Sequence, residues 1–279
     1  MTTLTGTTAL AGTATRTSPP ASTIGFGNVL RSEWTKLRTV RSTYWTALSA
    51  VLGTVGVGAL ICARTAYNIN RGDQDLTGFD ATLTSVSGIY LAQIAIGALG
   101  VLTICSEYST GMIRATFGAV PQRRALLVAK GLVFAAATLV TGEIMSFAAF
   151  GIGQVLLSRA HAGVSFGQPG VLRATIGGGL YLTAVGLLGF GLGALIRHTA
   201  GALSAFFGVA FALRALVDIL PSNWQANVSK YMPPNAGSQI ITVHPGHDVL
   251  APWAGLGVLC LYAAAATVAA TVLIGRRDA

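Results

Sequence analysis

Six apolar stretches, each about twenty residues or longer and nearly free of charge, dominate the sequence. They cover Tyr44–Ala63, Val86–Cys105, Gly131–Leu157, Ala174–Ile196, Thr199–Leu220 and Pro252–Ile274. A helix of about twenty residues crosses the roughly 30 Å hydrocarbon core of a bilayer. Six such stretches in 279 residues leave little room for a soluble domain. We therefore expect an all-α integral membrane protein, built as a bundle of six transmembrane helices.

The composition of the chain agrees with this class. Charged residues are only 10% of the chain, against about 25% in a typical soluble protein. The apolar stretches lack a strict two-residue alternation, which argues against a transmembrane β-barrel. Most of the 35 glycines fall inside apolar stretches, where small residues let helices approach closely. Gly189 and Gly193 form one such GxxxG pattern within the fourth stretch.

The distribution of charge predicts how the helices are oriented. If the N-terminus is cytoplasmic and the six spans alternate, twelve of the 18 lysines and arginines fall on the cytoplasmic side. The six on the other side are nearly balanced by five aspartates. This asymmetry follows the positive-inside rule. It predicts a multi-pass protein of the cell membrane with both termini in the cytoplasm, whose basic excess faces anionic lipid and a cytoplasmic partner rather than nucleic acid.

The segment before the first span divides into two parts. Residues 1–23 are rich in Thr, Ala, Gly, Ser and Pro and predict a disordered tail, so that the membrane domain covers 24–279. Residues 26–42 have the spacing of an amphipathic helix at the membrane surface, with Trp34 on the apolar face. Glu33 also lies within this apolar arc. It either pairs with Lys36, three residues on, or packs against protein and finds a fixed basic partner there.

Two connections between the spans are long enough to have functions of their own. Residues 106–130 form the longest cytoplasmic connection and predict two short amphipathic helices, the second beginning near Pro121. Such a surface can receive a partner protein, and Arg114, Arg123 and Arg124 are its candidate docking residues. The alternative for each of them is a charge that only sets the topology. Residues 221–251 are too polar to span and are expected to dip into the outer interface.

The chain lacks the residues for several kinds of chemistry. A phosphate-binding loop of the Walker type needs Gly before Lys-Ser/Thr, and none of the three lysines follows a glycine. The sequence His244-Pro-Gly-His247-Asp248 predicts a turn rather than a metal site, because no further ligand is evident. We expect no catalytic, cofactor or metal site in this chain.

Glu143 is the lone acid in the middle of the third stretch. Because an acid at mid-bilayer costs roughly 2.5–3.5 kcal/mol on insertion scales, it should face the bundle or a cavity. It either lines a translocation route or makes a structural hydrogen bond between helices, with Gln93 or Gln154 as partner. Both alternatives remain open at the level of the sequence.

Two sequence regions resemble a known family. Arg31-Ser-Glu-Trp-Thr-Lys-Leu-Arg38, followed by Arg41-Ser-Thr-Tyr-Trp45, is similar to the start of permease subunits of the ABC transporter type 2 family in its actinobacterial form. Glu107-Tyr-Ser-Thr-Gly-Met-Ile-Arg-Ala-Thr116, with Pro121-Gln-Arg-Arg124 and Ala129-Lys130, resembles that family's cytoplasmic segment. The similarity covers the chain from about residue 28 to its end.

The resemblance implies a six-span permease subunit of an ATP-binding cassette exporter. Two such subunits, identical or homologous, would pair on two separate subunits that bind ATP and Mg²⁺. The helix with Glu33, Trp34 and Lys36 would be the connecting helix, residues 106–130 with Glu107 would contact the ATPase, and 221–251 would be a re-entrant outer segment. The alternatives are a membrane anchor or immunity subunit that binds an ATPase without transport, and an integral-membrane enzyme.

Overall fold

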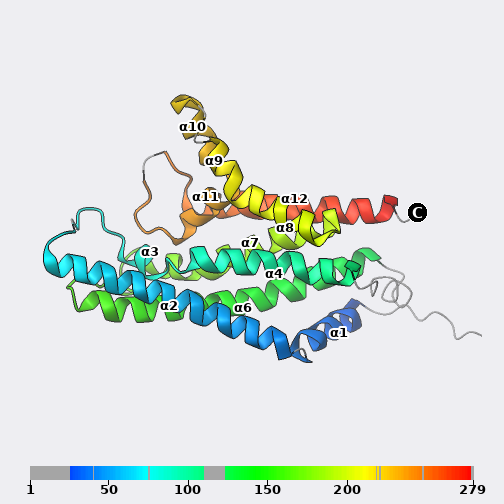
Figure 1. Ribbon diagram of the computed structural model, residues 1–279, viewed down its shortest axis with the longest axis horizontal. Coiled ribbons are helices and arrows are strands. Elements are labelled where there is room, and N and C mark those ends of the chain that lie inside the picture. The colour runs from blue at the N-terminus through cyan, green and yellow to red at the C-terminus, as the bar shows by residue number, and fades with distance from the viewer. Residues whose placement is uncertain are drawn as a thin grey trace, which may run out of the picture.

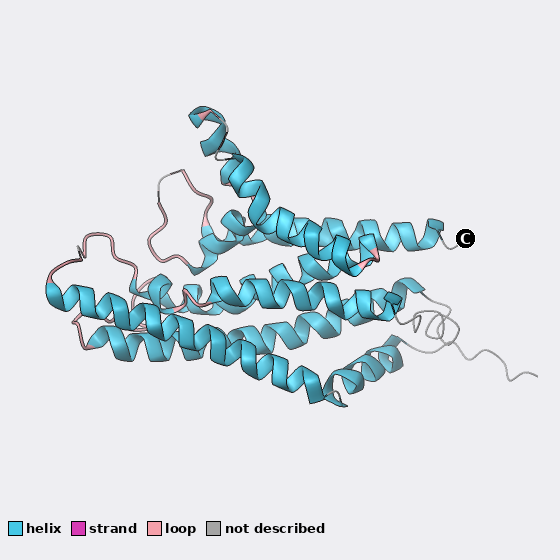
Figure 2. Cartoon of the chain, viewed as in Figure 1, coloured by secondary structure: helices cyan, strands magenta, loops and turns pink. Residues whose placement is uncertain are grey.

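The computed structural model of this chain describes residues 26–39, 41–74, 76–109, 123–217, 219, 221–246 and 248–277. Every regular element in this part of the chain is helical (Figures 1 and 2). Five helices are long and apolar enough to cross a membrane. These are α2 (Arg41–Arg71), α4 (Ile89–Ser109), α6 (Arg123–Ser158), α7 (Val171–Ile196) and α12 (Pro252–Arg277). The prediction of an all-helical chain with several apolar helices of membrane-spanning length is confirmed.

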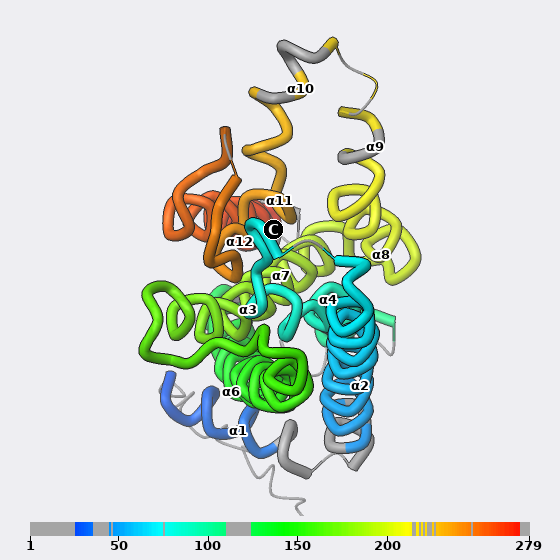
Figure 3. Tube along the Cα trace, turned by 90° about the vertical axis from the view of Figure 1, so that its left-hand side faces the viewer, coloured from blue at the N-terminus to red at the C-terminus, as the bar shows by residue number. Residues whose placement is uncertain are grey.

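Helix α7 forms the centre of the bundle and packs against α4, α6 and α12 (Figure 3). In the apolar part of α7, 67% of the residues are buried, against 17% in the apolar part of α2 and 22% in that of α12. Glycine makes the close packing of α7 and α4 possible. A Cβ atom on Gly189 would lie 2.2 Å from the carbonyl oxygen of Gly97, and one on Gly100 would lie 2.2 Å from that of Gly186. The GxxxG pattern of the sequence therefore lies on a helix-packing face.

The fifth predicted span takes a less regular form than the others. It comprises α8 (Thr199–Phe207), the π-helical turn η1 (Gly208–Ala212) and α9 (Leu213–Val217). The amide of Leu213 donates to the carbonyl of Gly208, five residues earlier. The apolar helix Thr199–Ala212 is too short to be one of the five candidate spans. The count of six spans therefore stays a prediction.

The outer segment predicted between the last two spans is made of short helices. They are α10 (Ser222–Ser229), α11 (Pro233–Ser238) and the 3-10 turn η2 (Gln239–Ile241). Helices α9 and α10 project from the bundle, whereas α11 lies against α12 (Figure 1). Ile240 and Ile241 are completely buried, and Ile240 packs over Gly177 of α7. Another short helix, α3 (Ala81–Ser85), lies before α4.

The predicted amphipathic helix is α1 (Phe26–Thr39), which packs on the first turns of α6. Val29 forms a small buried cluster with Leu126 and Ala129 of α6. Trp34 and Phe26 are exposed, and the position of α1 at the membrane interface stays a prediction. Helix α1 and the end of α12 lie at the same end of the molecule (Figure 1).

Candidate functional site: a buried ion triad at one end of the bundle

Three charged side chains from three helices meet at the end of the bundle where α1 lies. The ammonium Nζ of Lys130 on α6 is 2.8 Å from Oε2 of Glu33 on α1 and 2.6 Å from Oε1 of Glu107 on α4. The exposed fractions are 4% for Glu33, 7% for Glu107 and 7% for Lys130. Charges buried this deeply are stable only when paired and hydrogen-bonded. The triad therefore fixes α1 to both α4 and α6.

Helical spacing explains how these side chains come to face one another. On α1, Val29 and Glu33 are four residues apart and share one face. On α6, the opposing face is formed by Leu126, Ala129 and Lys130, which are spaced i, i+3 and i+4 and so also lie on one side of their helix. A small apolar contact thus places the carboxylate of Glu33 beside the ammonium group.

Of the two alternatives for Glu33, the structure shows the one in which it packs against protein and meets a fixed basic partner. That partner, Lys130, lies 97 residues further along the chain, so sequence spacing gave no way to identify it. The side chain of Lys36, the other candidate, lies outside the described residues.

The other predicted docking residues are placed only in part. Arg124 is exposed at the start of α6. The side chain of Arg123, and the whole of Arg114 within 110–122, lie outside the described residues. The prediction of a separate short helix from Pro121 was wrong, because α6 runs without a break from Arg123 to Ser158. No proline interrupts this sequence, so residues 123–130 and the apolar span form one continuous helix.

A second contact joins α4 to the turn between α7 and α8 near the triad. The guanidinium carbon of Arg197 lies 5.4 Å from the centre of the Tyr108 ring. Arg197 ends α7 in a left-handed conformation, with φ of 61°. His198 then caps α8, since its Nδ1 accepts a hydrogen bond from the amide of Gly201. Thus Tyr108, next to Glu107, extends the contacts of this end of α4 to α7.

The three polar residues predicted inside the bundle do not form one network. Gln93 accepts a hydrogen bond from the buried hydroxyl of Tyr181. Gln154 donates to Ser85 Oγ over 3.0 Å and accepts from the amide of Val164 over 2.7 Å.

Glu143 bonds neither of these glutamines. Its carboxyl group lies over Gly179 of α7, where a Cβ atom would be 2.5 Å from Cδ of Glu143. Its Oε2 atom is buried without a hydrogen-bond partner among the described residues. The proposed hydrogen bond from Glu143 to Gln93 or Gln154 is therefore absent, and a role for Glu143 in a translocation route stays a prediction.

The opposite end of the bundle is held by contacts that the sequence did not reveal. Asp80 caps α3 through a 2.8 Å bond from the amide of Leu83. Its other oxygen accepts from the amides of Val243 and His244, at 2.7 and 3.3 Å. Arg173 Nη2 donates to the carbonyl of Thr242 over 2.9 Å. The residues after η2 are thus tied to α3 and α7.

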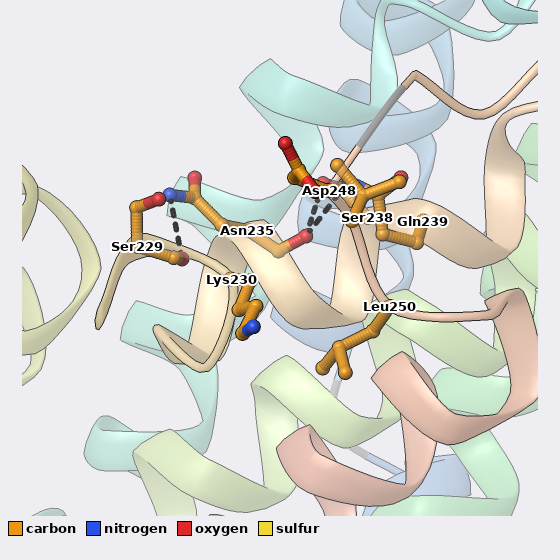
Figure 4. Close-up of a pocket in the computed structure, with 8 residues that line it drawn as sticks. Ser229, Lys230, Asn235, Ser238, Gln239, Asp248 and Leu250 are labelled. Atoms are coloured by element: carbon orange, nitrogen blue, oxygen red, sulfur yellow. Dashed lines mark hydrogen bonds between the residues drawn. The ribbon is translucent and has the colours of Figure 1, made fainter. Parts of the chain in front are cut away.

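A polar pocket of about 240 Å³ lies beside this outer segment (Figure 4). Asn235 is one of the residues that line this pocket. Its side-chain Nδ2 donates to the backbone carbonyl of Ser229, and the backbone carbonyl of Asn235 accepts hydrogen bonds from the side chains of Ser238 and Gln239. Lys230 and Asp248 also line it. The pocket therefore contains charged groups of both signs.

No protein-family model matches this chain, and comparison with curated proteins finds no match either.

Proposed function

We propose that this chain is the membrane-spanning permease subunit of an ATP-driven exporter, and that a separate ATP-binding subunit docks at the triad end of the bundle. The observation that supports this most directly is the position of Glu33, Lys130 and Glu107. Helix α4 ends at Ser109 and α6 begins at Arg123. The two helices that flank the connection 110–122 therefore meet α1 at one point, the ammonium group of Lys130.

This arrangement suits the transmission of movement from a partner into the bundle. A displacement of α1 or of the 110–122 connection acts on α4 and α6 together. Both helices pack on the central helix α7, and densely packed helices transmit strain instead of absorbing it. Binding and hydrolysis of ATP with Mg²⁺ are assigned to the partner, since the chain has no Walker loop. Switching between inward and outward access then follows from rigid-body motion.

We assign the remaining span, the fifth in chain order, to the segment α8–η1–α9. Its three helical pieces have nine, five and five residues, which give a length of about 28 Å, close to the roughly 30 Å of hydrocarbon. Six crossings agree with the placement of α1 and the end of α12 at one end of the molecule. We assign that end to the cytoplasm and α10–α11–η2 to a re-entrant outer segment of a plasma-membrane protein. The little-buried faces of α2 and α12 are available to lipid and to a second permease copy.

The test begins with the tagged chain purified from its native membranes together with any subunit that contains a Walker motif. The pair is then reconstituted in vesicles, and ATP turnover and solute flux are measured. Lys130→Met should uncouple the two activities, and Lys230→Met, a matched change at the outer segment, should not. Bound ATPase without flux would favour the anchor or immunity subunit. Catalytic turnover by the chain without any ATPase would favour an enzyme, and either result would refute the proposal.

A further inference from the structure

A second pocket, separate from the triad, lies between α4, α7, η1 and α11. Its volume is about 160 Å³, and its lining includes Tyr90, Gln93, Tyr181, Phe211, Met232 and Asn235. From its lining and its size we infer that this pocket binds a neutral, ring-bearing small molecule, or the ring-bearing end of a larger one, that accepts a hydrogen bond from Gln93.

The lining offers no counter-charge to a charged ligand. No residue that lines this pocket carries a formal charge, whereas Lys230 and Asp248 line the neighbouring pocket of Figure 4. An ion that entered would lose hydration without gaining a counter-charge, at high cost. The rings of Tyr90 and Phe211 and the thioether of Met232 instead offer polarizable surfaces to an aromatic or alicyclic ring.

One polar group is left open to a ligand in this pocket. The hydroxyl of Tyr181 donates to Oε1 of Gln93 and so fixes the orientation of the amide. Among the described residues nothing accepts a hydrogen bond from Nε2 of Gln93, and this nitrogen is not fully buried. A carbonyl or ether oxygen on the ligand would satisfy it. The amide of Asn235, by contrast, already donates to Ser229.

The size and the wall of the pocket narrow the class further. An apolar cavity of about 150 Å³ holds one benzene molecule, so 160 Å³ accommodates a single substituted ring. Val209, Ala210 and Phe211, which belong to the π-helical turn η1, form one wall. Such turns are rare and frequently occur at functional sites. Phe211 and Tyr90 are both exposed, so the pocket opens to the surface beside them.

The test uses the purified chain alone in phosphatidylcholine nanodiscs, so its outcome is independent of the proposed ATPase partner. The probe is 4-azidoacetophenone, a neutral aryl ketone that attaches to nearby residues on illumination. Labelling should saturate and map to peptides that line the pocket. Acetophenone should compete with it, and benzoate, which has the same ring but a negative charge, should not.

Three variants make the assignment specific. Ala210→Phe fills the pocket and should abolish saturable labelling, whereas Ala212→Phe, on the same turn but outside the lining, should leave it unchanged. Gln93→Leu should weaken binding about three- to tenfold, the range expected for one net hydrogen bond. Thermal melting of each variant checks that the bundle is intact. Labelling that rises linearly with probe, or that Ala210→Phe and Gln93→Leu both leave unchanged, would show partitioning into lipid and overturn the inference.

Discussion

Replacing Lys130 by methionine removes the positive charge that two buried carboxylates share, but keeps an unbranched side chain of similar length. The ammonium group lies 2.8 Å from Glu33 and 2.6 Å from Glu107. Removing one partner of a buried ion pair costs about 3–5 kcal/mol, because the remaining charge is left uncompensated. We expect the least costly relief to be that α1 leaves α6, since the described apolar contact between the two helices is a small cluster. A cost of about 3 kcal/mol raises the population of detached α1 roughly 10²-fold.

Hydrogen–deuterium exchange of peptides within 26–39, in nanodiscs, measures this detachment. Exchange of α1 should accelerate by about two orders of magnitude in Lys130→Met. Arg124→Met, an exposed change on the same helix, should have no effect. The triple variant Glu33→Leu, Glu107→Leu and Lys130→Met should restore most of the protection, because a buried ion cluster replaced by apolar groups is often neutral or stabilising. Exchange in Lys130→Met within about twofold of the wild type would refute the reasoning.

Three further changes test other parts of the bundle. Gly189→Ala should destabilise the bundle by about 1–3 kcal/mol, because its Cβ would lie 2.2 Å from backbone of α4; thermal melting should show no such loss for Gly151→Ala, where nothing lies within 4 Å. Asp80→Ala removes a helix cap and the acceptor for two amides; it should cost about 1–2 kcal/mol and speed exchange after η2, whereas the exposed Asp73→Ala should do neither. Glu143→Met removes a buried oxygen that has no partner among the described residues and should raise stability by about 1–3 kcal/mol, and a lower melting temperature would contradict this.

Hydropathy was sufficient to predict the helical class and the five long helices, because each of these helices is one long, continuous apolar stretch of the sequence. The fifth stretch was harder to predict. Its residues are as apolar as the others, but helical periodicity alone does not distinguish an α-helical turn from the π-helical turn at Gly208–Ala212. The sequence also missed the unbroken start of α6, where a proline was interpreted as the beginning of a separate helix.

The polar contacts show more clearly where sequence reasoning ends. The apolar arc of α1 showed that Glu33 needs a basic partner, since a carboxylate on that face is costly against lipid. The identity of the partner depends on how α6 packs on α1, which no spacing within α1 can reveal. The hydrogen bond from Tyr181 to Gln93 likewise joins two residues that are 88 positions apart in the sequence. The bonds from the amides after η2 to Asp80 join residues more than 160 positions apart. For such pairs the sequence predicts the need for a contact but not its other member.

The triad affects α1 more than it affects α4 or α6. Between apolar helices in lipid there is no hydrophobic driving force, so association depends on close packing and polar contacts. Helices α4 and α6 both keep extensive packing with α7 whether or not Glu107 meets Lys130. Among the described residues α1 packs mainly on α6, through the contacts around Val29 and the ion pair from Glu33 to Lys130. Because Glu33 and Glu107 share one ammonium group, a shift of the end of α4 that withdraws Glu107 leaves the whole charge of Lys130 to Glu33. The strength of the ion pair between α1 and α6 therefore depends on the position of α4. A coupling element at this end of the bundle would need this property.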